Sequence, residues 1–171
     1  MPCRAALGGM PMTPLDAVVT AREMLSQVTP LRFDCGRVCG GACCRSDEDG
    51  QGGMLLFPGE EALYRDLPTG FALKSNDQVI PGGRLLICEG TCDRSARPLS
   101  CRLFPLLPTE GSPCLDQRAW AVCPLMAYGV KGLRSEFVSA VQAAGRILFS
   151  CPEHRAFLSA LHAFNRRLTE F

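Results

Sequence analysis

The sequence lacks an excess of charge of either sign, a long apolar run and an abundance of aromatic residues. Its 18 basic and 17 acidic residues give a net charge of +1, and only 7% of the residues are aromatic. A nearly neutral chain argues against electrostatic binding of nucleic acid or of a membrane surface. No segment approaches the roughly 20 apolar residues that span a bilayer, and the N-terminal run MPCRAALGGMPM has no apolar core of signal-peptide length. We therefore predict a cytoplasmic protein that binds neither nucleic acid nor a membrane.

Histidine is equally scarce, and the familiar catalytic motifs are missing. A cysteine nucleophile needs a neighbouring base, but His154 and His162 are the only histidines, and both are predicted to play packing or surface roles in C-terminal helices. The sequence contains no phosphate-binding loop, Rossmann glycine pattern, Ser-His-Asp order or paired-carboxylate motif. Glu60 and Glu61 are interpreted as solvated acids in the first turn of a helix.

Cysteine, by contrast, is abundant, with 11 in 171 residues. A chain of this length buries roughly 70% of its unfolded surface, so it does not depend on disulfides for stability. In a reducing compartment, clustered cysteines more often bind metal or take part in catalysis than form disulfides. Three alternatives are considered: a disulfide framework, a thiol redox or nucleophilic site, and a metal site.

The cysteines fall mainly into two groups that are far apart in the sequence. The first is CGRVCGGACC at residues 35–44, and the second is CEGTCDRSARPLSC at residues 88–101, followed by a late cysteine in AVCPLM. Short-range pairs repeated in two distant segments are typical of chains that wrap thiolates around a metal. The eight candidate metal ligands are Cys35, Cys39, Cys43, Cys44, Cys88, Cys92, Cys101 and Cys123.

Thiolate ligands favour zinc or an iron–sulfur cluster over magnesium or calcium. Eight thiolates fit two zinc sites, or one iron–sulfur cluster and one zinc, and both alternatives stay open. The neighbouring side chains of Cys43 and Cys44 diverge in an extended backbone, so the two are predicted to serve different ions, or one of them is a spare ligand. Cys114 and Cys151 are interpreted as small buried apolar residues and Cys3 as part of a mobile terminus; whether Cys114, Cys151 or His154 joins the site stays open. Arginines beside the cysteines could offset the thiolate charge: Arg37, Arg45, Arg94, Arg97 and Arg102.

The predicted fold is a small α+β domain covering residues 1–171, with short antiparallel strands and cysteine-rich loops around a metal centre. Helical spacing predicts a first helix over residues 14–27, with Thr13 as its N-cap. Residues 55–67 predict a strand and then a short helix, and residues 83–88 and 117–123 have the composition of strands. Two C-terminal helices, about 135–170, are predicted to form a hairpin, the second opened by a capping box over residues 150–153.

The stretches FDCGRVCGGACC, EGTCDRSARPLSCRLFP and the final CP resemble the YkgJ-like cysteine-cluster family, described as a zinc- or iron-chelating domain. The resemblance covers about residues 33–124 and places the eight candidate cysteines on that family's cysteines. The segment with the pattern Arg-Pro-x-x-Cys-Arg-x-x-Pro corresponds to Arg97, Pro98, Cys101, Arg102 and Pro105. The resemblance implies metal binding and leaves the biological role open.

The leading hypothesis is a metal-binding protein that holds zinc or an iron–sulfur cluster through these eight cysteines; whether it has a protein partner stays open. If the site is structural, protein ligands fill every coordination position of the metal. If the site is functional, one coordination position is open or exchangeable and permits electron transfer, group transfer or metal delivery. The alternative is a metal-free thiol redox enzyme using a pair such as Cys43 and Cys44. Another is an interaction protein that uses the apolar stripe of the last helix.

Overall fold

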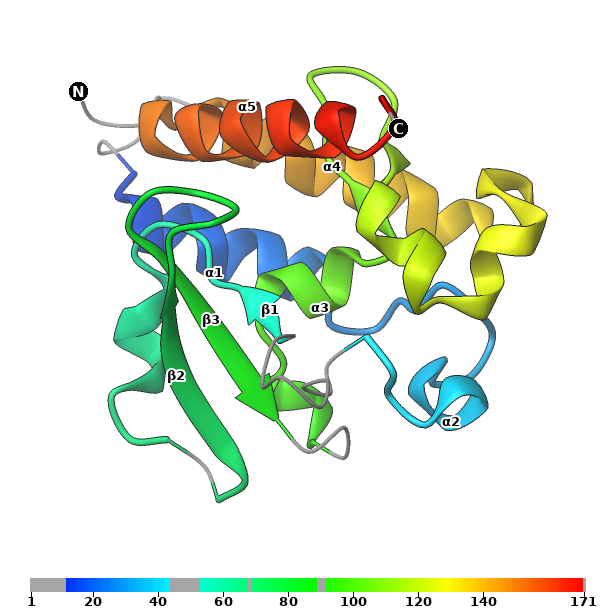
Figure 1. Ribbon diagram of the computed structural model, residues 1–171, viewed down its shortest axis with the longest axis horizontal. Coiled ribbons are helices and arrows are strands. Elements are labelled where there is room, and N and C mark those ends of the chain that lie inside the picture. Colours follow the sequence, from blue (N-terminus) through cyan, green and yellow to red (C-terminus); the bar gives the residue numbers. More distant parts are fainter. Residues whose placement is uncertain (1–11, 44–52, 68, 89–91, 171) are drawn as a thin grey trace.

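The computed structural model describes residues 12–43, 53–67, 69–88 and 92–170, and it confirms an α+β fold with helices at both ends and antiparallel strands in the middle (Figure 1). The α-helices are α1 (Pro14–Met24), α2 (Gly36–Cys39), α3 (Leu99–Leu103), α4 (Ser135–Phe149) and α5 (Pro152–Arg167). The strands are β1 (Met54–Leu55), β2 (Phe71–Asn76), β3 (Gly83–Cys88), β4 (Leu106–Leu107) and β5 (Cys114–Leu115). Short 3₁₀ helices are η1 (Glu60–Tyr64), η2 (Arg94–Ala96), η3 (Gln117–Ala121), η4 (Pro124–Tyr128) and η5 (Val130–Gly132).

Helix α1 begins where the sequence predicts and ends three residues earlier. Thr13 caps it through a reciprocal capping box, in which the Asp16 N–H donates to Thr13 Oγ1 (3.2 Å) and the Thr13 N–H donates to Asp16 Oδ2 (2.9 Å). Beyond its C-terminal end, the carbonyls of Leu25, Ser26 and Val28 accept hydrogen bonds from the guanidinium of Arg94. The backbone after Met24 is thus held by a side chain from the segment between Cys92 and Cys101 instead of by further helical hydrogen bonds.

The larger sheet has the strand order β1-β3-β2, with both pairs antiparallel. The strand predicted over residues 83–88 is confirmed as β3, and its register pairs Leu86 with Met54 of β1 and Cys88 with Phe71 of β2. Cys88 is therefore fixed at the end of the central strand. A second, two-stranded sheet pairs β4 with β5.

The strand predicted over residues 117–123 is wrong, because residues 117–121 form the 3₁₀ helix η3. The side chain of Asp116 accepts hydrogen bonds from the Arg118 N–H (3.0 Å) and from the Arg118 guanidinium. A local cap of this kind competes with strand pairing and overrides the strand-like composition of the segment.

The two predicted C-terminal helices are confirmed as α4 and α5, but the predicted capping box is wrong. Cys151 is the N-cap of α5 and makes no side-chain capping hydrogen bond, while the Ser150 hydroxyl donates backward to the Ile147 carbonyl (2.6 Å). Of the predicted apolar stripe on α5, Phe157 and Leu161 are buried, whereas Leu168 is 44% exposed.

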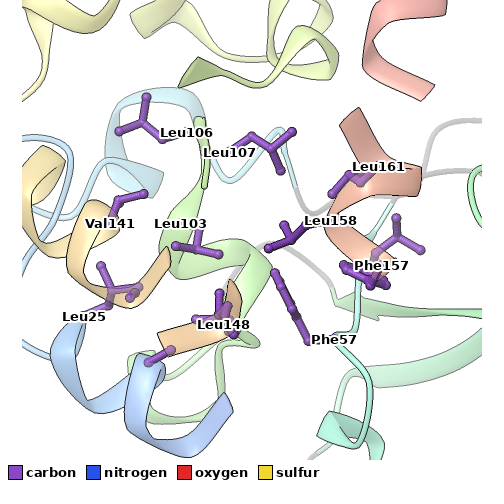
Figure 2. Close-up of a cluster of buried hydrophobic side chains, with 14 of the residues drawn as sticks. Leu25, Phe57, Leu103, Leu106, Leu107, Val141, Leu148, Phe157, Leu158 and Leu161 are labelled. Atoms are coloured by element: carbon purple, nitrogen blue, oxygen red, sulfur yellow. The ribbon is translucent and has the colours of Figure 1, made fainter. Parts of the chain in front are cut away.

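The main core joins the two ends of the chain to the short helix α3. Helix α1 packs against α4 and α4 against α5, and Leu103 of α3 projects into the same cluster (Figure 2). Figure 2 also shows Phe57 reaching between Leu148 and Leu158. Because α3 is anchored by this core, Cys101, which α3 carries, has a fixed backbone position.

Candidate metal centre

The leading cysteine group is organised by α2, a single helical turn. Cys35 and Cys39 lie four residues apart and therefore on the same side of the turn, with Cys39 Sγ 3.8 Å from the Cys35 carbonyl oxygen. Gly40 and Gly41 end the turn in the left-handed region, at φ 61° and 72°, and both amides donate to the Gly36 carbonyl. The glycine-rich stretch is thus a helical turn followed by a tight reversal, whereas the sequence predicts cysteine-rich loops here.

The two glycines that flank this turn give a matched pair of variants. Gly40→Ala places a side chain at φ 61° and is expected to lower the free energy of unfolding by about 1 kcal/mol. Gly36→Ala has an ordinary φ, and its added Cβ meets only Asp34 Oδ1 at 3.5 Å, so it should be neutral or slightly stabilising. Urea unfolding of both variants tests this, and equal midpoints would contradict the assigned turn.

Four of the eight candidate cysteines line one small cavity. Cys35, Cys39 and Cys43 of the leading group meet Cys123, which precedes η4, across walls that include Phe104 and Leu125. The volume of the cavity is about 20 Å³, which is enough for one water molecule or one metal ion. The cavity thus brings the leading group together with the distant Cys123, and no cysteine of the group at residues 88–101 lines it.

Cys101 lies in the same neighbourhood, on a small apolar cluster shared with the cavity cysteines. Cys43, Cys101 and Cys123 are half-buried and pack against a second core cluster. Its buried members are Met54, Phe104, Ala119 and Met126. Five of the eight predicted ligands therefore gather at one region of the molecule.

The other three predicted ligands are placed differently. Cys92 is half-buried and interacts with the guanidinium of Arg97. Cys88 is buried at the end of β3, and neither it nor Cys92 or Cys101 lines the cavity. Cys44, adjacent to Cys43, lies outside the described residues.

Burial raises the pKa of two of the four cavity thiols, those of Cys35 and Cys123. It raises the pKa of Cys35 to about 11, with Asp34, Cys39 and Cys123 adding to the rise and Arg97 opposing it. Burial also raises the pKa of Cys123. Because the thiolate is the reactive form, these thiols are poor nucleophiles at neutral pH.

The donor set fits a soft metal in kind, because several thiols converge on a cavity of ion size. The side chains do not stand in coordinating positions, since within the described ranges no group of three or more His, Cys, Asp or Glu residues is arranged to hold an ion. Binding would therefore require thiols to rotate toward the cavity.

Cys114, Cys151 and both histidines do not line this cavity, and Cys3 lies outside the described residues. Cys114 is exposed, so its predicted burial is wrong, and Cys151 is fully buried as predicted but disulfide-bonded. His154 is fully buried with Nε2 2.8 Å from the Pro14 carbonyl oxygen, and His162 Nε2 lies 2.7 Å from the Pro108 carbonyl oxygen. Both histidines thus have packing roles.

The interpretation of Glu60 as a solvated acid is wrong, whereas Glu61 is exposed as predicted. Glu60 is 0% exposed, and its carboxylate accepts hydrogen bonds from the amides of Phe57 (3.0 Å) and Leu99 (2.7 Å). Arg22 lies 3.4 Å from the same carboxylate. Glu60 therefore ties the first residue of α3 to the segment after β1, close to Cys101 in the chain.

The arginines beside the cysteines do not all serve the thiols. Arg94 and Arg102 direct their hydrogen bonds to backbone carbonyls, those of Arg102 being the carbonyls of residues 22, 94, 95 and 97. Arg37 is exposed, and Arg45 lies outside the described residues. Arg97 instead forms a two-pronged ion pair with Asp34, a residue that the sequence did not single out.

Comparison of the chain with known protein families, with curated proteins and with solved structures finds no match. The resemblance to the YkgJ-like family accordingly stays a prediction from the cysteine order. Over the part of the chain that the structure describes, no helix is both long enough and apolar enough to cross a bilayer.

Proposed function

We propose that this protein binds zinc or an iron–sulfur cluster through its clustered cysteines, in the cytoplasm. The observation that carries the proposal is the convergence of Cys35, Cys39 and Cys43 with the distant Cys123 on one ion-sized cavity. Thiols gathered from two separate segments are the arrangement expected of a thiolate metal site. The predicted resemblance to the YkgJ-like family supports the same function.

The residues assigned to the metal are the eight candidate cysteines, with the cavity group as the first site. The packing of Cys101 beside Cys43 and Cys123 supports its inclusion. Bound zinc would organise the glycine-rich turn, whereas an iron–sulfur cluster would supply electron transfer. The raised pKa values of Cys35 and Cys123 make these two thiols poor nucleophiles for a metal-free thiol enzyme.

Three cysteine variants test the proposal. Cys39→Ser and Cys123→Ser each remove one cavity thiol, and we expect each to weaken cobalt or zinc binding by at least about tenfold, because a hydroxyl is a poor ligand for these ions. Cys114→Ser changes an exposed thiol on β5 and should bind metal as the unchanged protein does. The measurement is titration of reduced, metal-free protein with Co²⁺, followed by the sulfur-to-cobalt absorption band.

Circular dichroism of the same samples before metal addition establishes that each variant is folded. Undiminished binding in both cavity variants, or an equal loss in Cys114→Ser, would refute the assignment of the cavity as the site.

A further inference from the structure

The ion pair between Asp34 and Arg97 joins the two cysteine groups across 63 positions of sequence. Arg97 donates through Nη1 to Asp34 Oδ1 (2.9 Å) and through Nη2 to Asp34 Oδ2 (2.6 Å). Two parallel hydrogen bonds fix the orientation of the guanidinium as well as its position. Asp34 directly precedes Cys35, and its carboxylate also accepts a hydrogen bond from the Gly36 N–H (3.2 Å). The ion pair is therefore bonded to the first residue of α2.

Arg97 also faces thiols of both groups. Its guanidinium hydrogen-bonds the Cys92 thiol of the middle pair. The carboxylate to which it donates, that of Asp34, directly precedes Cys35 of the leading group. One guanidinium thus bonds a cysteine of the middle pair and the residue next to a cysteine of the leading group.

The backbone that carries Arg97 is itself held in place. Arg102 Nε donates to the Arg97 carbonyl (3.1 Å), and Arg102 in turn is tied to the Arg94 carbonyl (2.9 Å). The Arg97 side chain is 21% exposed and that of Asp34 is 34% exposed, so the pair is partly shielded from water. Most exposed ion pairs contribute little to stability, but a bidentate arginine–carboxylate pair with a well-held backbone is the case in which a contribution is expected.

A second ion pair shows what a purely local role looks like. Arg118 and Asp116 are two residues apart and together cap η3, so that pair stabilises a single turn of the chain. Arg97 is the C-cap residue of η2 through its backbone N–H, but its side chain reaches Asp34 and so connects two segments that both carry candidate ligands.

We propose that Arg97, oriented by Asp34, is a positioning residue for the metal centre. It holds Cys92 in register with Cys35 before metal arrives and offsets the negative charge of the thiolates once metal is bound. The inference rests on the proposed metal-binding function and deepens it, because it names a residue outside the ligand set on which affinity depends. Loss of such supporting groups typically weakens metal binding about 10- to 100-fold.

The test compares Arg97→Gln with Arg155→Gln by Co²⁺ titration of reduced, metal-free protein. Arg155 is exposed, its guanidinium bonds the Phe149 carbonyl, and it belongs to neither group of candidate cysteines, so removing its charge is the matched control. We expect Arg97→Gln to bind Co²⁺ about 10- to 100-fold more weakly, with the sulfur-to-cobalt band unchanged at saturation because no ligand is lost. Arg155→Gln should bind as the unchanged protein does.

A charge-conserving variant separates the effect of the Arg97 charge on Co²⁺ affinity from a purely structural role of the side chain. Arg97→Lys keeps the positive charge but cannot make the two parallel hydrogen bonds of a guanidinium. We expect it to recover part of the Co²⁺ affinity that is lost in Arg97→Gln. Equal affinity in Arg97→Gln and the unchanged protein, even with a lowered unfolding midpoint, would overturn the inference, and so would a complete absence of recovery in Arg97→Lys. If the unchanged protein binds no Co²⁺ and is also purified without zinc or iron, the proposed function itself is overturned.

Discussion

Removing bound metal with a chelator is expected to destabilise the cysteine-bearing part of this protein selectively. The metal binds the folded chain, so at a free concentration about a thousandfold above Kd it adds roughly 4 kcal/mol to the free energy of unfolding. The cavity walls at α2 and Cys123 rest on the small cluster around Met54, Phe104, Ala119 and Met126, whereas α1, α4 and α5 share the larger core. The effect should therefore be concentrated in the first region.

Amide hydrogen exchange in the metal-loaded and chelated protein measures this effect. After chelation, protection should fall in α2 and around η3 and η4, while α4 and α5 keep theirs. Cys39→Ser serves as the control, because the chelator should leave its exchange unchanged. Identical exchange in the loaded and chelated unchanged protein would contradict a metal that organises this region.

Replacing Glu60 with glutamine should produce the largest stability loss of any conservative change near the site. The carboxylate uses one oxygen for the Phe57 amide and the other for both the Leu99 amide and Arg22. A glutamine side chain would turn its NH₂ toward one of these donors and leave it unsatisfied in the interior, at a cost of about 3 kcal/mol. Glu61→Gln, at the exposed neighbouring position, should change stability by less than about 0.5 kcal/mol.

The same residue makes stability depend on pH. Burial raises the pKa of Glu60 to about 7 from its usual 4.5, despite the opposing hydrogen bonds from Leu99 and Phe57 and the charge of Arg22. The folded state thus binds the proton more tightly than the unfolded state, and stability falls as the pH rises from 4.5 to about 7, by on the order of 3 kcal/mol.

Urea unfolding of the unchanged protein and of Glu60→Gln, from pH 5 to pH 8, isolates this contribution. Subtraction removes the opposite effect of His154, whose pKa burial lowers so that its contribution to stability is lost as the pH falls. The difference in free energy between the two proteins should shrink as the pH rises toward 7. A difference independent of pH would mean that Glu60 does not titrate in this range.

The sequence was sufficient for elements whose signal is local. The capping residues Thr13 and Asp16 located the start of α1, and the β-strand composition of residues 83–88 located β3. The strand predicted over residues 117–123 failed because Asp116 and Arg118 form a cap that strand composition does not register. The acidic pair at residues 60 and 61 looked solvated, and only the fold brings the Phe57 and Leu99 amides to Glu60.

The candidate site was predictable as a set of cysteines but not as an arrangement. Spacing alone grouped Cys35, Cys39 and Cys43, and the structure places Cys123 with them around the cavity. Nothing in the spacing distinguishes the cavity cysteines from Cys88, which is held at the end of β3. The ion pair of Asp34 with Arg97 depends on two segments meeting in space, and a single sequence carries no signal for such a contact.

The most direct test of the proposed function is the metal and acid-labile sulfide content of the protein, purified without oxygen and without added metal, together with its visible spectrum. The proposal predicts either bound zinc without sulfide and without colour, or iron with sulfide and a brown chromophore. In either case the metal should be lost in Cys39→Ser and retained in Cys114→Ser. Purified protein that carries neither metal, and does not take one up after reduction, would contradict the proposal.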